Sequence, residues 1–145
     1  MNIAFFLVPK HEVVCLTNQS TLRQALERME FHRYTAVPVL SEAGHYIGTI
    51  TEGDLLWYLK NTEGASFENA HRHLLSSIPM RMQNHPVPID AKMEDLITKA
   101  KTQNFVPVID DRKQFIGIVR RSDIIEYCAQ QLFSAATTAA SKQNG

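Results

Sequence analysis

One stretch of sequence occurs twice in this chain and decides its fold. Residues Tyr46–Asp54 read YIGTITEGD, and residues Phe115–Asp123 read FIGIVRRSD. The pentapeptide at Ala36–Leu40, AVPVL, returns in the same way as FVPVI at Phe105–Ile109. Both pairs are separated by the same 69 positions, so the chain contains an internal repeat. The repeat has to be interpreted before any single motif.

Outward from these stretches, each copy shows the same order of secondary structure. A helix ahead of each Val-Pro-Val strand is indicated by apolar residues at helical spacing, namely Leu22, Ala25, Leu26 and Met29, and then Met93, Leu96, Ile97 and Ala100. Thr21 and Gln24 have the spacing of a capping box at the first helix. Two strands, at 36–40 and 46–51, flank a polar turn, and a second helix follows, so each copy reads β-α-β-β-α.

The repeat predicts four segments. They are the first copy at 8–60, a linker at 61–80, the second copy at 81–132 and a disordered tail at 133–145. The linker is expected to contain a short helix near 67–75. A unit of about 60 residues buries only about 60% of its chain surface, so neither copy should be stable alone. We therefore predict an α/β fold in which the copies pack sheet to sheet about a pseudo-two-fold axis. Two related clefts would lie between them, and such an interface is a natural ligand site.

Composition excludes several classes of function. The 145 residues include 15 Lys+Arg and 15 Asp+Glu, with 44% hydrophobic residues, which is typical of a globular domain and not of a general nucleic-acid binder or an acidic disordered chain. Apolar runs are too short for a membrane span, and the start lacks the basic region of a signal peptide. Cys15 and Cys128 have no metal or redox spacing, so we expect reduced core thiols in a cytoplasmic protein.

The stretch at 48–54 is the strongest candidate for binding chemistry. It runs from a strand end into a helix start, where free backbone amides favour anions, so Thr51 and those amides suit phosphate oxygens. Asp54 offers two acceptors suited to a ribose diol. The Thr51-x-x-Asp54 spacing also fits a helix capping box, and spacing alone leaves both interpretations open.

The second copy differs at the same place, because Arg120 stands where the first copy has Thr51. A fixed cation at a helix N-terminus is unfavourable unless an anion lies nearby, and guanidinium pairs well with phosphate. The alternative is that Arg120 and Arg121 are a solvated surface pair.

Other candidate sites are weaker. His71 and His73 lie in the linker without an obvious carboxylate or cysteine partner, so a solvated pair is favoured over a metal site. Asp110 and Asp111 could bind Mg²⁺, but two acids in a hairpin turn are usually turn formers. No nucleophile and base pair is recognisable, so we predict no catalytic residue, no metal and no enzyme activity.

The doubled pattern resembles a tandem pair of cystathionine-β-synthase (CBS) domains, the Bateman module, over nearly the whole chain. In that family each Thr/Ser-x-x-Asp junction binds the phosphate and ribose of an adenosine compound. The resemblance implies that Thr51 takes the phosphate and Asp54 the ribose. It also implies that the adenine lies by the Val-Pro-Val strand, near Thr35, Ala36 and Val37.

The second junction keeps Asp123 but has Arg120 in place of the family's Thr or Ser. It resembles a subgroup of small stand-alone CBS pairs from Gram-positive bacteria that bind cyclic di-AMP and carry an Arg-Arg pair here. The residues that this resemblance implies near the ligand are Arg120 and Arg121 at the phosphodiester, Thr35 and Ala36 at an adenine, and Glu12 and Val14 beside the cleft.

The repeat and the resemblance together predict a non-catalytic regulatory module. Its ligand would be an adenine nucleotide (AMP, ADP or ATP) or cyclic di-AMP, bound between the repeats without a catalytic cofactor. We expect a homodimer that signals to a separate partner protein in trans, because the ligand would favour one arrangement of the repeats. The alternative is a structural or protein-interaction dimer with vestigial clefts. A nucleotide hydrolase is a third class, for which the sequence lacks a base or metal cluster.

Overall fold

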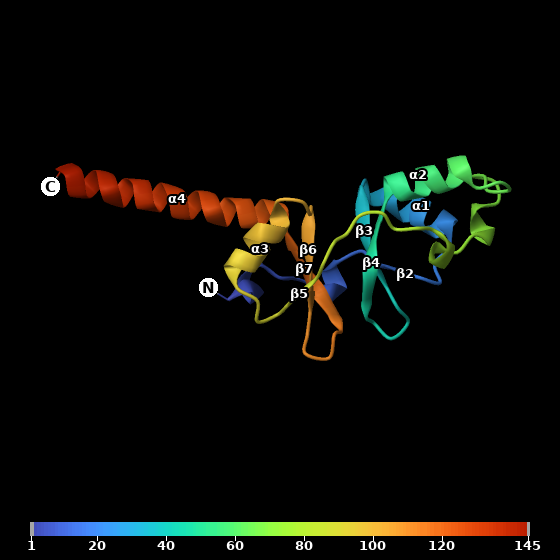
Figure 1. Cartoon of the computed structure of the whole chain (residues 1–145), viewed down its shortest axis with the longest axis horizontal. Coiled ribbons are helices and arrows are strands. Elements are labelled where there is room, and N and C mark those ends of the chain that lie inside the picture. Colours follow the sequence, from blue (N-terminus) through green and yellow to red (C-terminus); the bar gives the residue numbers. More distant parts are fainter. Residues whose placement is uncertain (1, 145) are drawn as a thin grey trace.

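In the computed structural model, which describes residues 2–144, two α/β modules place their sheets next to each other in the middle of the molecule, with the helices on the outside (Figure 1). The first module has a sheet of order β2-β3-β4, made of Leu16–Thr17, Ala36–Leu40 and Tyr46–Thr51. Its helices are α1 (Leu22–His32) and α2 (Glu52–Asn61). The predicted α/β fold with one sheet in each copy is confirmed.

The second module has a sheet of order β1-β7-β6-β5, made of Val8–Pro9, Phe115–Arg120, Phe105–Ile109 and Val87–Pro88. Its helices are α3 (Met93–Ala100) and α4 (Arg121–Asn144). The hairpins of the two modules share one register, because Ala36 pairs with Thr51 as Phe105 pairs with Arg120. The repeat in the sequence is therefore a repeat in backbone hydrogen bonding.

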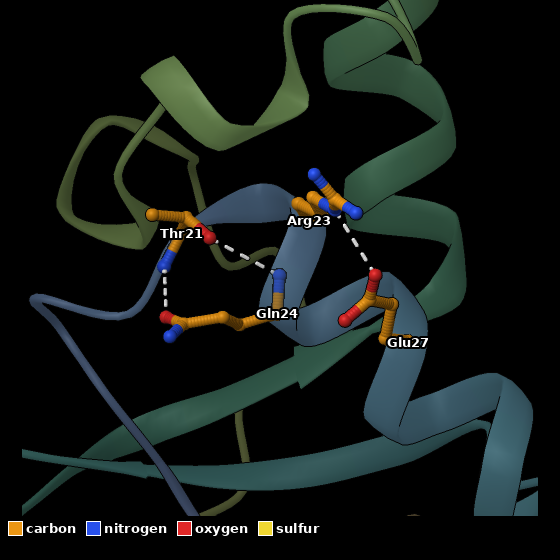
Figure 2. Close-up of polar contacts among 4 residues, drawn as sticks. All are labelled: Thr21, Arg23, Gln24 and Glu27. Atoms are coloured by element: carbon orange, nitrogen blue, oxygen red, sulfur yellow. Dashed lines mark hydrogen bonds and ion pairs between the residues drawn. The ribbon is translucent and has the colours of Figure 1, made fainter.

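The start of α1 shows how the sequence fixes a helix boundary (Figure 2). The Gln24 N–H donates to Thr21 Oγ1 at 3.1 Å, and the Thr21 N–H donates to Gln24 Oε1 at 2.9 Å, so the predicted capping box is confirmed. One turn on, Arg23 Nε donates to Glu27 Oε1 at 3.0 Å on the exposed face. At α3 the residue before the helix is Lys92, which has no side-chain acceptor, and its N–H donates to Asp95 Oδ2. The second copy thus keeps half of the box.

Each module has its own apolar core. The first core includes three residues from the linker, Ala70, Leu75 and Ile78, packed with residues such as Leu16, Leu22, Val37, Ile50 and Leu55. The short helix expected near 67–75 is instead two 3-10 turns, Ala70–Arg72 and Leu75–Ser77. In the structure the linker is the whole connection from the end of α2 to the start of β5, residues 62–86, and its part up to Ile78 closes the core of the first module.

The N-terminal segment crosses to the other module. Although Val8 opens the first copy in the sequence, it pairs antiparallel with Ile118 of β7, and Ile3 is fully buried in the second core. A Cβ at Gly117 would overlap the carbonyl of Val8, so only glycine lets β1 approach this closely. The first residues of the chain therefore complete the sheet of the second module.

The segment 133–145 was predicted to be a disordered tail, and that prediction is wrong as far as Asn144, where α4 ends. Gly145 lies outside the described residues. The alanine content accounts for the difference, because alanine has the highest helix propensity. The extended end of α4 projects away from both sheets (Figure 1). Over residues 2–144, no helix has the length and apolar character that crossing a membrane requires.

Candidate functional site

The first strand-to-helix junction is held by a reciprocal pair of hydrogen bonds. The Asp54 N–H donates to Thr51 Oγ1 at 3.1 Å, and the Thr51 N–H donates to Asp54 Oδ2 at 2.9 Å. The capping box that the spacing allowed is therefore present. The other carboxylate oxygen of Asp54 accepts from the Arg81 N–H at 3.2 Å, and Asp54 is only 3% exposed. Asp54 thus fixes both the start of α2 and the path of the linker.

A cleft of about 450 Å³ opens beside this junction. Its walls come from the start of β3, the first turns of α2, the linker and the second module: Thr35, Ala36, Thr51–Asp54, Trp57, Arg81, Met82 and Asn104. Two contacts bring the first walls together, because Ala36 pairs with Thr51 in the sheet and the Glu52 N–H donates to the Thr35 carbonyl at 3.0 Å. The cleft therefore joins three separate parts of the chain.

The chemistry of this cleft suits an anion joined to a flat apolar group. The N-terminus of α2 opens into it, and Arg81 adds a fixed positive charge. Trp57 and Met82 supply aromatic and thioether surface against which a ring can pack. Lys60 Nζ lies 5.5 Å from the centre of the Trp57 ring, so a cation also contacts this indole.

Comparison with known proteins identifies the family. The CBS domain model matches two segments of this chain, residues 7–61 and 75–130. The chain belongs to the CBS-domain family. Each match overlaps one of the two copies found by the repeat, although the second begins at 75 and not at 81, so the predicted tandem CBS pair is confirmed.

Individual relatives agree with this assignment. A CBS domain-containing protein of Dictyostelium discoideum is 28% identical over 117 residues, which cover 74% of this chain and 78% of that protein. The crystal structure of CbpB in complex with c-di-AMP superposes with a TM-score of 0.81 at 19% identity, covering 95% of this chain and 91% of that one. CBSX2 in complex with AMP gives a TM-score of 0.68 at 20% identity, covering 89% and 96%. These structures share the fold of this CBS pair.

The structure gathers only part of the predicted ligand set into the first cleft. Thr35, Ala36, Thr51 and Asp54 lie together there. Val37 does not, because it is 1% exposed and belongs to the first core. Alternation along β3 explains the difference, since successive side chains of a strand point to opposite faces.

The remaining predicted residues lie elsewhere in the CBS pair. Val14 lines a different cleft, beside α1. Arg120 is exposed at the end of β7, and Asp123 is half-buried in the first turn of α4. The Arg121 Nε donates to the Gln103 carbonyl at 2.8 Å, and its N–H donates to the Asn104 carbonyl at 3.1 Å. Arg121 therefore holds the loop from which Asn104 reaches the first cleft.

Six residues that line the cleft were not named as ligand contacts from the sequence: Glu52, Gly53, Trp57, Arg81, Met82 and Asn104. One of them had a signal in the sequence, because Asn104 stands 69 positions after Thr35, which is the shift of the repeat. Thr35 and Asn104 line the same cleft, so the repeat shift applied to Thr35 would have found its counterpart in the second copy. The linker residues had no such signal.

The structure also places the two linker histidines and Cys15. The Tyr58 hydroxyl and His73 Nδ1 are hydrogen-bonded at 2.7 Å, so the prediction of a solvated histidine is wrong for His73, while His71 is exposed. Among residues 2–144, no group of three His, Cys, Asp or Glu side chains could hold a metal ion. Cys15 is half-buried, and burial raises the pKa of its thiol to about 11.

Proposed function

We propose that this CBS pair is a regulatory module that binds an adenosine-containing nucleotide in the cleft at Thr51–Asp54. The observation that carries the proposal is the composition of the cleft, since the first repeat, the linker and Asn104 of the second repeat all line it. An occupant would contact both repeats at once and so favour one arrangement of them. The CbpB complex with c-di-AMP and the CBSX2 complex with AMP support the ligand class.

The proposed roles follow the chemistry of each wall. The phosphate lies at the N-terminus of α2, against the Thr51 hydroxyl and the Arg81 guanidinium. The adenine packs near Ala36, between the indole of Trp57 and Met82. No covalent step is assigned to any of these groups, and the nucleotide is released unchanged.

Asp54 connects ligand binding to the linker. A ribose hydroxyl that reaches Oδ1 of Asp54 would donate to the same oxygen that accepts from the Arg81 N–H, and this oxygen has lone pairs for both donors. Ligand and linker would then be joined through one carboxylate, so that binding changes the position of the linker at Arg81. A partner protein that recognises only one linker position would then respond to the nucleotide, within the limit set by the ligand's differential affinity.

A dinucleotide ligand would use the second junction as well. Arg120 is exposed, and Arg121 keeps its terminal nitrogens beyond the Nε bonded to Gln103. We propose these two arginines as the phosphodiester contacts if the ligand is cyclic di-AMP. Asp123 would take the ribose role that Asp54 has in the first repeat.

The chain contains a built-in reporter for this proposal, because Trp57 is its single tryptophan and lines the cleft. We would titrate AMP, ADP, ATP, S-adenosylmethionine and cyclic di-AMP while following tryptophan emission and the melting temperature. Binding to the folded state raises the melting temperature with ligand concentration. Nucleotide recovered after long incubation should be unchanged by chromatography, and steady hydrolysis would contradict a non-catalytic module.

Two variants locate the ligand. Arg81→Ala keeps the backbone N–H bonded to Asp54 and should weaken a phosphate ligand about tenfold, since charged hydrogen bonds contribute about 1.5–3 kcal/mol. Arg72→Ala is the matched control, because Arg72 is exposed in the linker outside the cleft. Arg120→Ala should weaken cyclic di-AMP and leave AMP unchanged. If no nucleotide changes either signal, the proposal fails.

One observation favours the structural alternative. A groove of about 1250 Å³ runs along α1 and α2, and large apolar side chains stand exposed beside it, with Phe31 82%, Phe67 70% and Leu56 53% exposed. Exposed apolar surface of this kind marks protein interfaces. Two results together would establish this alternative. Analytical ultracentrifugation would show a homodimer that Leu56→Glu dissociates, and the nucleotide titrations would change neither tryptophan emission nor melting temperature.

A further inference from the structure

A second cleft, of about 590 Å³, opens at the edge of the first repeat between α1 and the segment that leads into β2. Four basic side chains line it, those of Lys10, His11, Arg28 and His32. Residues 13–15 form its apolar floor. No acidic residue is among the residues that line it. The Glu12 carboxylate faces outward to His11, with 4.0 Å between Oε1 and Nε2.

In the second repeat a buried side chain fills the corresponding position. There the side chain of Gln103 occupies the space between the end of α3 and the segment before β5, and it is 2% exposed. Its Oε1 accepts from the His85 N–H at 3.0 Å, and its Nε2 donates to the carbonyls of His85 and Phe105 at 3.3 Å each. The uncharged side-chain amide of Gln103 thus satisfies the backbone hydrogen-bonding groups of His85 and the carbonyl of Phe105.

The first repeat leaves the corresponding space open because α1 is longer. It has 11 residues against 8 in α3, and it ends where Arg33 adopts a left-handed conformation with φ 58°. His32, in the added turn, stacks on Tyr34 with ring centres 5.2 Å apart and planes 11° apart. An imidazole therefore stands at the rim where the second repeat has a buried amide.

Arg28 is already positioned in this cleft. Its Nη1 donates to the Cys15 carbonyl at 2.8 Å, which fixes the guanidinium and leaves its other N–H groups for a ligand. Lys10 and Arg28 both act to lower the pKa of the Cys15 thiol, against the larger effect of burial, so the field of both cations reaches the floor. A preorganised guanidinium with a second cation is the arrangement that binds phosphate well.

We propose that this cleft binds a small molecule that carries a phosphate group on an apolar body, independently of the nucleotide cleft. Arg28 and Lys10 hold the phosphate, the imidazoles of His11 and His32 supply further N–H donors, and the floor at 13–15 packs against the apolar part. Lys10 and His11 lie in the turn that follows β1 and packs on β7, so this cleft also borders the second module, on a different side from the cleft at Arg81.

The experiment is an NMR titration of the ¹⁵N-labelled chain with phenyl phosphate, inorganic phosphate and phenol. Phenyl phosphate should shift the amides of residues 10–15 and of the last turn of α1, and it should bind more tightly than either fragment. Arg28→Ala should weaken it about fivefold or more, as expected for one partly screened charged hydrogen bond. Arg23→Ala is the matched control, since Arg23 is exposed on the same helix and pairs with Glu27.

Lys10→Ala serves as the second variant, because loss of the bond to the Cys15 carbonyl in Arg28→Ala can disturb the fold. Weakening by Lys10→Ala with an unchanged amide spectrum supports the proposal. Shifts that stay the same in both variants, shifts confined to the Arg81 cleft, or no shifts at all would overturn it. AMP binding is followed by the emission of Trp57, which lines the Arg81 cleft only. A negative result with phenyl phosphate therefore leaves the nucleotide proposal to its own test.

Discussion

The two strand-to-helix junctions of this CBS pair share one backbone register and have different side-chain functions. In the first repeat, Thr51 caps α2, and Asp54 is buried and bonded to the linker. In the second, Arg120 occupies the position paired with Phe105 and has no acceptor with which to cap α4. The hairpin pattern therefore determines where a junction forms, while one side chain decides whether the following helix has a hydroxyl cap, as α2 does, or a cation in that position, as α4 does.

The glycines of the two hairpins give the largest expected difference. A Cβ at Gly117 would overlap the backbone of Val8, whereas a Cβ at Gly48 would lie 3.0 Å from the flexible end of Met80. Gly117→Ala should therefore lower the free energy of unfolding by at least about 2 kcal/mol, and Gly48→Ala by less than about 1 kcal/mol. Urea denaturation measures both. Equal losses would mean that β1 does not hold the second sheet as described.

The junctions themselves should differ by a smaller amount. Thr51→Ala removes the cap of α2 and should cost about 1 kcal/mol of unfolding free energy. Arg120→Ala removes an exposed cation at a helix N-terminus, so its effect should lie within about 0.5 kcal/mol. Thermal and urea unfolding of the two variants provide the comparison. A large loss from Arg120→Ala would show that this arginine has a structural partner.

The ends of the second helices differ as well, because α2 stops at Asn61 and α4 continues to Asn144. Leu132 and Phe133 are exposed on this extension, so deleting residues 133–145 should change the unfolding free energy by less than about 0.5 kcal/mol in the monomer. Differential scanning calorimetry at two protein concentrations tests this. A loss that grows with concentration would show instead that the extension packs against a second copy.

The smallest effect concerns the two cysteines, one in each repeat. Burial raises the pKa of the Cys15 thiol from 9.0 to about 11, so at pH 8 its thiolate fraction should be about 100-fold below that of an unperturbed cysteine. Iodoacetamide labelling, followed by mass spectrometry over pH 7–11, gives the reactivity of each thiol.

The sign of the linked stability follows from the same pKa. The folded state holds the Cys15 proton more tightly, so this contribution is complete below about pH 9 and is lost as the pH rises towards 11. Cys15→Ser should lack this alkaline loss. Rapid labelling of Cys15 at pH 8 in the folded protein would contradict its burial.

Much of the fold could be predicted from the sequence, because it depends on local and periodic signals. The strands at 36–40 and 46–51 have the predicted bounds, and the capping box at Thr21 is present. The crossing of β1 to the second module had no such signal, since two residues of strand carry no periodicity and their partner lies in the other half of the chain. The helical end of α4 was not predicted, because the segment mixes alanine, which has the highest helix propensity, with Ser, Thr and Asn, whose propensity is lower.

The site was predictable to a similar degree. The junction motif pointed to Thr51 and Asp54, and the resemblance to CBS pairs implied Thr35 and Ala36; the structure places all four in one cleft. Arg81 and Met82 were missed because a linker has no pattern that states which module it lies against. The side chain of Val37 is buried in the first core, so a contact between Val37 and a ligand in this cleft would have to involve its backbone.

The pairing of Val8 with Ile118 also has a consequence for the order of folding. During synthesis the first repeat and its linker can assemble as soon as they leave the ribosome, but the earliest strand of the chain must wait until β7 has been made. Bringing together two strands so far apart in the sequence costs chain entropy and therefore slows folding, so the second repeat should finish folding last. Any fusion or deletion at the N-terminus therefore acts on the repeat that is encoded last, and the two halves cannot be separated by a single cut between them.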